Sequence, residues 1–241
     1  MTAALLWGLF SSAALYLGQW LAKPLGKSER AIGLMMGFGA GTLLSAVAYE
    51  LVPESTLEHG WKIALSFMVG ALAYYVGDRL IDRRGGSART AIAAGKGQDG
   101  SGAAMFLGAL LDGIPEAFIL GLTLALGGNI SVAFVAAIFV SNIPQGLAGT
   151  TSLQEAGTPD RRIFVMWTLL TITCGLTSLF GYVMADELRN AGLIAEGFAG
   201  GAVLMMLADS MMPEAFRHGG RTVGLLTVVG FLVAGVLTVV Q

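Results

Sequence analysis

Two carboxylates lie within a long apolar stretch of this sequence. Asp112 and Glu116 fall inside the apolar run 103–126, and a spacing of four places both on one face of a helix. Pro115 stands between them, and proline has no N–H, so it leaves a backbone carbonyl without its helical partner. Ionisable side chains at membrane depth are costly and usually face an ion path, a cavity or a partner. The stretch therefore indicates a cation site.

A weaker version of this pattern occurs in the next apolar run, 130–152. There Ser141, Asn142 and Gln145 surround Pro144. The two runs are joined by a short Gly-Gly-Asn turn, so we expect antiparallel neighbours whose prolines lie at similar depth. Together they would form two walls of one site.

The side chains of these two walls offer oxygen ligands only. Carboxylate and amide oxygens suit hard or borderline ions such as Mn²⁺, Mg²⁺, Ca²⁺ or Fe²⁺. Zinc also accepts carboxylate oxygen, so it remains a candidate. Two carboxylates would neutralise a divalent ion, and protons could replace it when it leaves, which suggests cation/proton exchange or proton-sensitive release.

The composition is that of an integral membrane protein. The 241 residues are 55% hydrophobic and 12% charged, with a mean hydropathy of +0.73, whereas soluble domains average about 25% charged residues. The net charge of −2 and the lack of a basic, aromatic-rich patch give no indication of a nucleic-acid partner. The single cysteine, Cys174, lies in an apolar run and is expected to be a small packing residue.

Eight apolar runs are long enough to cross a bilayer, which needs roughly 20 helical residues. We therefore predict an all-α membrane protein forming a single domain over 1–241, with a cytoplasmic loop at about 81–102. The predicted spans are 3–22, 31–52, 61–80, 103–126, 130–152, 162–184, 192–213 and 221–240.

Positive charges are distributed unevenly between the connections. Of the 14 Lys and Arg residues, only Lys62 and Arg189 fall in one alternating set of connections, and the other twelve fall in the opposite set. Because Lys and Arg gather on the cytoplasmic side, we expect a multi-pass protein of the cell membrane with both termini outside the cytoplasm.

An internal repeat relates the two ends of the chain. The segment 37–54 matches 197–214 at a constant offset, both beginning Gly-Phe and ending Pro-Glu. The predicted spans carrying them run in opposite directions, which is typical of inverted repeats in transporters. We expect the first three and last three spans to be related, with the fourth and fifth between them.

With these features, the sequence resembles the ZIP (Zrt/Irt-like) family of divalent metal transporters over nearly its whole length. The resemblance rests on the eight spans, the long loop after the third, the Ile-Pro-Glu of the fourth, the Asn-Ile-Pro-Gln of the fifth and the repeated Gly-Phe…Pro-Glu pattern. It implies a divalent metal as the transported substrate, no prosthetic group and a possible homodimer.

The resemblance also implies which residues hold the metal. Asp112 stands at the family's histidine of the fourth helix, Gly113 at its asparagine and Glu116 at its glutamate. The ligand positions of the fifth helix hold Ser141, Asn142 and Gln145. Family members bind two metals with histidines and carboxylates at these positions. Because this chain has no histidine there and fewer carboxylates, the resemblance implies one cation site.

Other polar residues have less specific interpretations. Asp112 and Glu116 could instead bond to neighbouring helices, and Asn142 and Gln145 fit interhelical hydrogen bonding as well as ligation. Residues that could line a pathway are Asp209, Glu50, Thr177 and Ser178. Residues expected at helix ends or turns, facing water, are Glu54, Glu58, His59, Glu214 and His218.

The function predicted from the sequence is transport of a divalent metal, zinc or else manganese or iron, into the cytoplasm. One alternative is a ZIP-fold protein that carries another cargo or has lost transport. A more distant one is an intramembrane enzyme using the carboxylate pair as acid and base, for which the sequence offers no nucleophile–base constellation.

Overall fold

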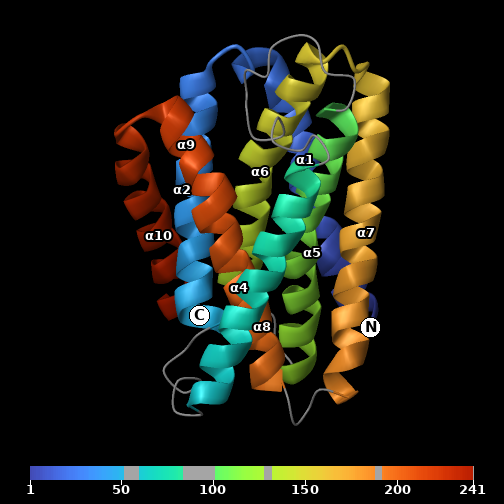
Figure 1. The fold of residues 1–241 in the computed structure, drawn as a ribbon, viewed down its shortest axis with the longest axis vertical. Helices are drawn as coiled ribbons and strands as arrows, with labels where there is room; N and C mark the ends of the chain where they lie inside the picture. The colour runs from blue at the N-terminus through green and yellow to red at the C-terminus, as the bar shows by residue number, and fades with distance from the viewer. Residues whose placement is uncertain (52–59, 84–100, 128–131, 188–191, 241) are drawn as a thin grey trace.

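The computed structural model describes residues 1–51, 60–83, 101–127, 132–187 and 192–240, and within these ranges every regular element is a helix (Figure 1). Eight helical spans are long and apolar enough to cross a membrane. The predicted all-α, eight-span fold is therefore confirmed. The loop expected at about 81–102 falls mostly outside the described residues, between α4 and α5.

The helices follow the chain in a simple up-and-down order, and two of the spans contain a short π-helical segment. The elements are α1 (Thr2–Leu25), α2 (Glu29–Ala46), η1 (Val47–Leu51), α4 (Trp61–Asp82), α5 (Ser101–Gly127), α6 (Val132–Glu155), α7 (Asp160–Glu187), α8 (Gly192–Met206), η3 (Leu207–Met211), α9 (Met212–Gly219) and α10 (Thr222–Val240).

One predicted boundary was wrong. The seventh span was expected to end at residue 213, but the helix runs on to Gly219 as α9. Pro213 lies in the first turn of α9, directly after the π-helical segment η3, and a proline is tolerated at such a position because its missing N–H is not needed there. A proline in this sequence therefore marked a change of helix type and not a helix end.

The eight spans form two groups, judged by their most extensive contacts. In one group α1 packs on α6 and α7, and α5 packs on α7. In the other, α2 packs on α9 and α10, and α4 packs on α8. The two groups meet where α2 crosses α6 and where α5 crosses α8, so the two proline-containing helices α5 and α6 belong to the same group.

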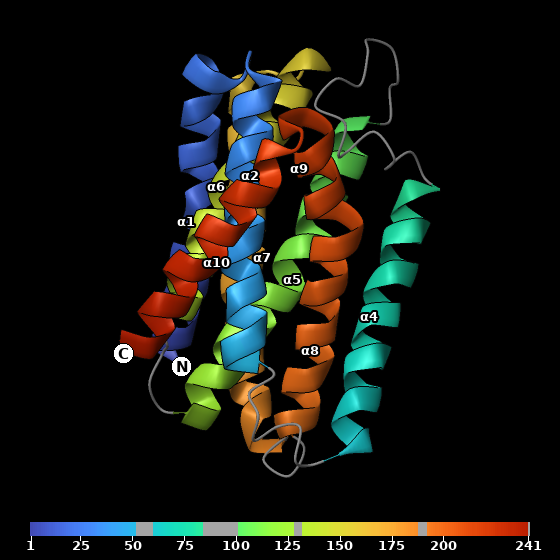
Figure 2. The ribbon, with the colours of Figure 1, turned by 90° about the vertical axis from the view of Figure 1, so that its left-hand side faces the viewer.

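The contacts follow the predicted inverted repeat. We exchange α1 with α7, α2 with α8, α4 with α10 and α5 with α6. Three major interfaces then become other observed ones: α2–α10 becomes α8–α4, α1–α6 becomes α7–α5, and α2–α6 becomes α8–α5. Helices α2 and α8 run in opposite directions (Figure 2). The repeat is therefore inverted, with α5 and α6 between its halves.

Glycines at two helix crossings also follow the inverted repeat. At each crossing a Cβ added to the glycine would overlap a backbone carbonyl oxygen of the facing helix. The pairs are Gly41 with Thr227 and Gly230 with Phe38 between α2 and α10, and Gly201 with Phe67 and Gly70 with Phe198 between α8 and α4. Every member of one set is 160 residues from its counterpart in the other. The repeat thus extends to individual backbone contacts.

The two π-helical segments also correspond. Val47–Leu51 and Leu207–Met211 occupy equivalent positions in the two halves, and Tyr49 is the counterpart of Asp209. A π-helical turn adds one residue to the helix, and such turns are frequent at functional sites. The α-helix is therefore interrupted by a π-helical turn at equivalent positions in the two halves.

We predict that Gly41→Ala or Gly201→Ala destabilises the protein, because the added methyl group meets backbone atoms that cannot rotate away. The expected cost is about 1–3 kcal/mol or more, which would lower the melting temperature of the purified protein in detergent by several degrees. Gly224→Ala is the control, since its Cβ would find only Phe216 Cζ, at 3.8 Å. Equal melting temperatures for all three variants would contradict the close-packed crossings.

Candidate functional site

Asp112 lies on α5 at the boundary between the two helix groups. Its side chain is half-buried, and its Oδ1 accepts a hydrogen bond from the Tyr74 hydroxyl of α4, at 2.5 Å. Because α4 belongs to the other group, this bond joins the two groups at the level of the predicted site. The bond fixes one oxygen of Asp112.

Glu116, one turn further along α5, is buried with 2% of its surface exposed. Within the part of the chain that the structure describes, neither of its carboxylate oxygens has a hydrogen-bond partner. Its helix face approaches α7 closely, since a Cβ on Gly113 would lie 2.9 Å from Cys174 Sγ. A buried carboxylate without hydrogen bonds is costly, so Glu116 requires a partner such as a cation or a proton.

The polar residues of α6 point in different directions. Ser141 is buried and donates its hydroxyl to Ile138 O of its own helix, at 2.8 Å. Asn142 is also buried, and its Nδ2 donates to Ser11 O of α1, at 3.3 Å. The amide of Asn142 thus makes the interhelical bond that was one of its two expected roles, while its carbonyl oxygen remains a possible ligand. Gln145 is half-buried.

The structure brings α5 and α6 into contact, but it does not collect a dense ligand cluster. No three His, Cys, Asp or Glu side chains gather in a way that could hold a metal ion among the described residues. The predicted carboxylate ligands are the pair on α5, Asp112 and Glu116. Further oxygens would have to come from α6 side chains and from the carbonyls of Leu111 and Val140, which Pro115 and Pro144 leave without a helical N–H.

The four expected pathway residues lie in different surroundings. Asp209 is exposed on the π-helical segment η3, while Glu50 of η1 and Thr177 of α7 are half-buried. Ser178 is buried and donates to Ala4 O of α1, at 2.9 Å, so it contributes to the α1–α7 contact. Cys174 is buried and free, as expected for a small packing residue.

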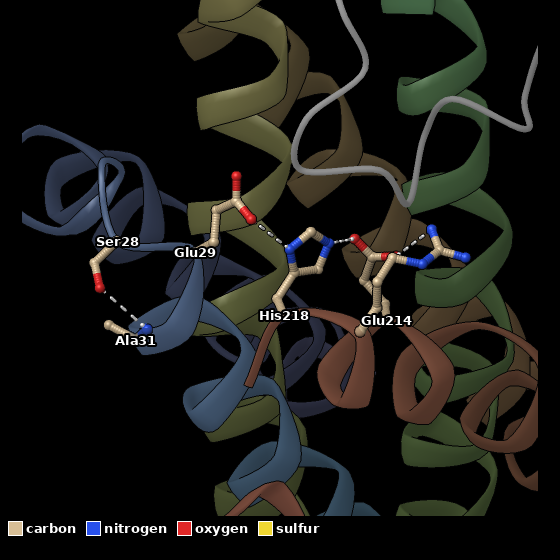
Figure 3. Close-up of polar contacts among 6 residues, drawn as sticks. Ser28, Glu29, Ala31, Glu214 and His218 are labelled. Atoms are coloured by element: carbon tan, nitrogen blue, oxygen red, sulfur yellow. Dashed lines mark hydrogen bonds and ion pairs between the residues drawn. The ribbon is translucent and has the colours of Figure 1, made fainter. Parts of the chain in front are cut away.

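Two residues expected to face water do not. Glu214 is 3% exposed, and the side chain of His218 is 6% exposed. His218 Nε2 lies 2.9 Å from Glu214 Oε1, and its Nδ1 lies 3.1 Å from Glu29 Oε2 (Figure 3). The prediction was wrong because α9 continues beyond Pro213 and turns both residues inward. Glu54, Glu58 and His59 lie outside the described residues.

Three polar residues near the site were missed in the sequence. Tyr74 and Asp78 lie one turn apart on α4, and both are buried. Thr171 of α7 is buried one turn before Cys174 with no hydrogen-bond partner for its hydroxyl in the described chain. A signal existed for Asp78, since an aspartate inside a predicted span is itself a functional indication.

Fold and site together define a multi-pass membrane protein built as an inverted repeat, with a carboxylate pair on a proline-containing helix between its halves. Comparison with curated proteins supports the resemblance to metal transporters. The chain is 27% identical, over 193 residues, to a protein of Arabidopsis thaliana named as a candidate zinc transporter. The match covers 77% of this chain but only 30% of the length of that relative. No family model matches the chain.

We predict that Tyr74→Phe destabilises the protein by about 1–3 kcal/mol, because it removes the donor to a partly buried carboxylate. The melting temperature of the purified protein in detergent would show this loss. Tyr75→Phe is the matched control: the Tyr75 ring packs 5.0 Å from the Arg79 guanidinium, a contact that does not need the hydroxyl. If Tyr74→Phe and Tyr75→Phe melt together with wild type, the bond to Asp112 contributes nothing to stability.

Proposed function

We propose that the chain is a ZIP-like transporter that moves a divalent metal cation into the cytoplasm through a site between α5 and α6. Asp112 and Glu116 would be its charged ligands, with Ser141, Asn142, Gln145 and backbone carbonyls as neutral ones. The relative from Arabidopsis thaliana supports this class of activity by its name, and the inverted repeat supports it by architecture, because such symmetry underlies alternating access in many transporters.

The observation that carries the proposal is the buried carboxylate of Glu116, which has no hydrogen-bond partner among the residues that the structure describes. Without a counter-charge, such a group is expensive at membrane depth. A divalent ion bound between Glu116 and Asp112 would neutralise both charges. When the ion leaves, protons would take its place, so we propose that metal movement is linked to protons.

The ligand chemistry bears on which ion is carried. With oxygen donors only, Mn²⁺ and Fe²⁺ fit the site as well as Zn²⁺ does. The small number of charged ligands also leaves a second candidate function, a ZIP-fold protein that carries another cargo or has lost transport. The absence of a three-group metal cluster among the described side chains favours that alternative, and the experiment below separates the two.

The proposed orientation places the ends of α4 and α6 and the start of α7 in the cytoplasm of a cell-membrane protein, with both termini outside. It is supported by the unequal distribution of Lys and Arg between the two sides. The start of α1 and the end of α10 lie toward the opposite end of the bundle from α9 (Figure 2). A homodimer remains a prediction of the resemblance.

The test of transport is metal uptake into proteoliposomes for Zn²⁺, Mn²⁺, Fe²⁺, Co²⁺, Cd²⁺ and Mg²⁺. We expect wild type to take up at least one of these ions and the double variant Asp112→Asn/Glu116→Gln to fall to the level of protein-free liposomes. Glu155→Gln, at the exposed end of α6, is the control and should transport normally.

Uptake by the double variant equal to that of wild type would refute the site. No uptake of any ion by wild type would favour the second candidate function. Carboxylates must lose their protons to bind metal, so uptake should decline as the pH falls from about 8 to 5. Uptake that is equal at both pH values would contradict the proton link.

The orientation predicts different labelling of two exposed lysines replaced by cysteine in a Cys174→Ser background. Lys62→Cys, at the start of α4, should react with a membrane-impermeant maleimide on intact cells, and Lys27→Cys, between α1 and α2, should react only after the cells are opened. Labelling in the reverse pattern would mean that the protein is inserted the other way round.

A further inference from the structure

A hollow lies between three helices at one end of the bundle, outside the predicted metal site. It forms where the second half of α1 and the end of α6 meet the start of α7, at the upper end in Figure 1, and its volume is about 410 Å³. Side chains of α1 and α7 line most of it, and α6 contributes Gln154. Because α1 packs on both α6 and α7, the hollow is built on the main interfaces of this helix group.

The inner part of the hollow is aromatic. The rings of Tyr16 and Phe164 meet across the α1–α7 contact, with their centroids 5.2 Å apart. Trp20 is 68% exposed and Phe164 is 53% exposed. The Tyr16 hydroxyl already donates to Thr168 Oγ1, at 3.0 Å. Exposed aromatic rings near the end of a membrane span are typical of the bilayer interface, and these rings offer an apolar surface to a lipid chain.

The outer part of the hollow holds two cations, Lys23 in the last turn of α1 and Arg161 in the first turn of α7. Both are exposed, and among the described residues neither forms an ion pair. The acid of the lining is Asp160, whose Oδ1 accepts a hydrogen bond from Gln154 Nε2 at 2.8 Å. The lining therefore has a net positive charge, and its two cations are available to an anion.

The chain around the hollow is also basic. Residues 23–27 and 155–162, which include the end of α1 and the start of α7, contain four Lys or Arg residues and two acidic ones. A surface with an excess of one charge raises the local concentration of ions of the opposite sign. Anions are therefore attracted to this end of α1 and α7.

The order of these side chains along the helices matches the order of groups in a phospholipid. Seven residues separate Lys23 from Tyr16, which is about 10 Å along the axis of α1. On α7, Arg161 lies at the start of the helix and Phe164 lies almost one turn further in. Both helices thus place a cation at the end of the span and an aromatic ring nearer its middle. A soluble anion would use only the cations, whereas a phospholipid would contact both parts.

We propose that this hollow binds a phospholipid with an anionic headgroup, whose phosphate lies between Lys23 and Arg161 and whose acyl chain lies against Trp20 and Phe164. Arginine can hold phosphate oxygens with two parallel N–H donors, and lysine binds them as a point charge. Basic pockets between membrane helices bind anionic headgroups in other proteins. The lipid would connect α1 with α7. Its site depends neither on the predicted metal site nor on the proposed transport.

Binding is tested by the fluorescence of Trp20 in phosphatidylcholine nanodiscs that contain a brominated lipid, because bromine quenches a tryptophan that it contacts. The chain has four tryptophans, so the Trp20 signal is the difference between each protein and the same protein carrying Trp20→Phe. We expect brominated phosphatidylglycerol to quench this signal in wild type at about one-tenth of the mole fraction that brominated phosphatidylcholine requires. Equal quenching by the two lipids would mean ordinary contact with the bilayer and would overturn the proposal.

The double variant Lys23→Gln/Arg161→Gln should lose this preference and keep the melting temperature of wild type in detergent, since both side chains are exposed. Arg30→Gln/Arg221→Gln is the matched control, because it removes two exposed cations from α2 and from the turn before α10, outside the hollow. It should keep the preference. Equal losses in both double variants would mean attraction by the overall surface charge, and no loss in either would mean that the two cations do not hold the headgroup. Each of these results would overturn the site.

A soluble phosphate separates the lipid from its headgroup. Glycerol 1-phosphate has the phosphate but no acyl chain, so an excess of it should leave the quenching by brominated phosphatidylglycerol unchanged. If it restores the fluorescence of Trp20, the hollow takes a soluble phosphate compound, and the assignment to a lipid is overturned.

Discussion

Helices in hydrocarbon gain little from burying apolar surface against each other, because the lipid is equally apolar, so close packing has to hold them together. In this protein the closest packing occurs where glycines let one helix rest on the backbone of another. Gly41 and Gly230 do this between α2 and α10, and Gly70 and Gly201 do it between α4 and α8. These contacts are equivalent in the two halves of the chain, and they fix the frame against which α5 and α6 lie.

That frame explains why charged groups can be kept inside. Asp112 lies where α5 meets α4 and accepts a hydrogen bond from the Tyr74 hydroxyl. Glu116 is buried and has no hydrogen bond from the described chain. Folding alone gains nothing from burying such a group. The tight helix contacts provide the stability that allows the protein to keep Glu116 in an unfavourable state, as binding sites often do.

Much of this architecture could be predicted from the sequence. Hydropathy and length located all eight spans, because helices that cross lipid must be apolar over their whole length. The repeated Gly-Phe…Pro-Glu segments identified the inverted repeat, because their glycines lie at equivalent helix crossings in the two halves. Side-chain partners were less predictable. Asn142 could be placed on its helix but not toward Ser11, and Tyr74 was not recognised as a donor to Asp112. Such pairings depend on how two helices are rotated about their axes, which the periodicity of one helix does not determine.

The polar side chains do not follow the symmetry of the backbone. The two halves match in their glycines and π-helical segments, yet Asp209 occupies the position equivalent to Tyr49. Likewise, Asp112 and Glu116 around Pro115 of α5 correspond to the neutral Ser141 and Gln145 around Pro144 of α6. In transporters built as inverted repeats, such a symmetric frame provides two similar conformations of opposite access. Asymmetric charges make them unequal in energy, because each charge meets different surroundings when the halves exchange roles. The positions at which the two halves carry different residues, such as Tyr49 and Asp209, are thus the positions that make the two halves chemically different.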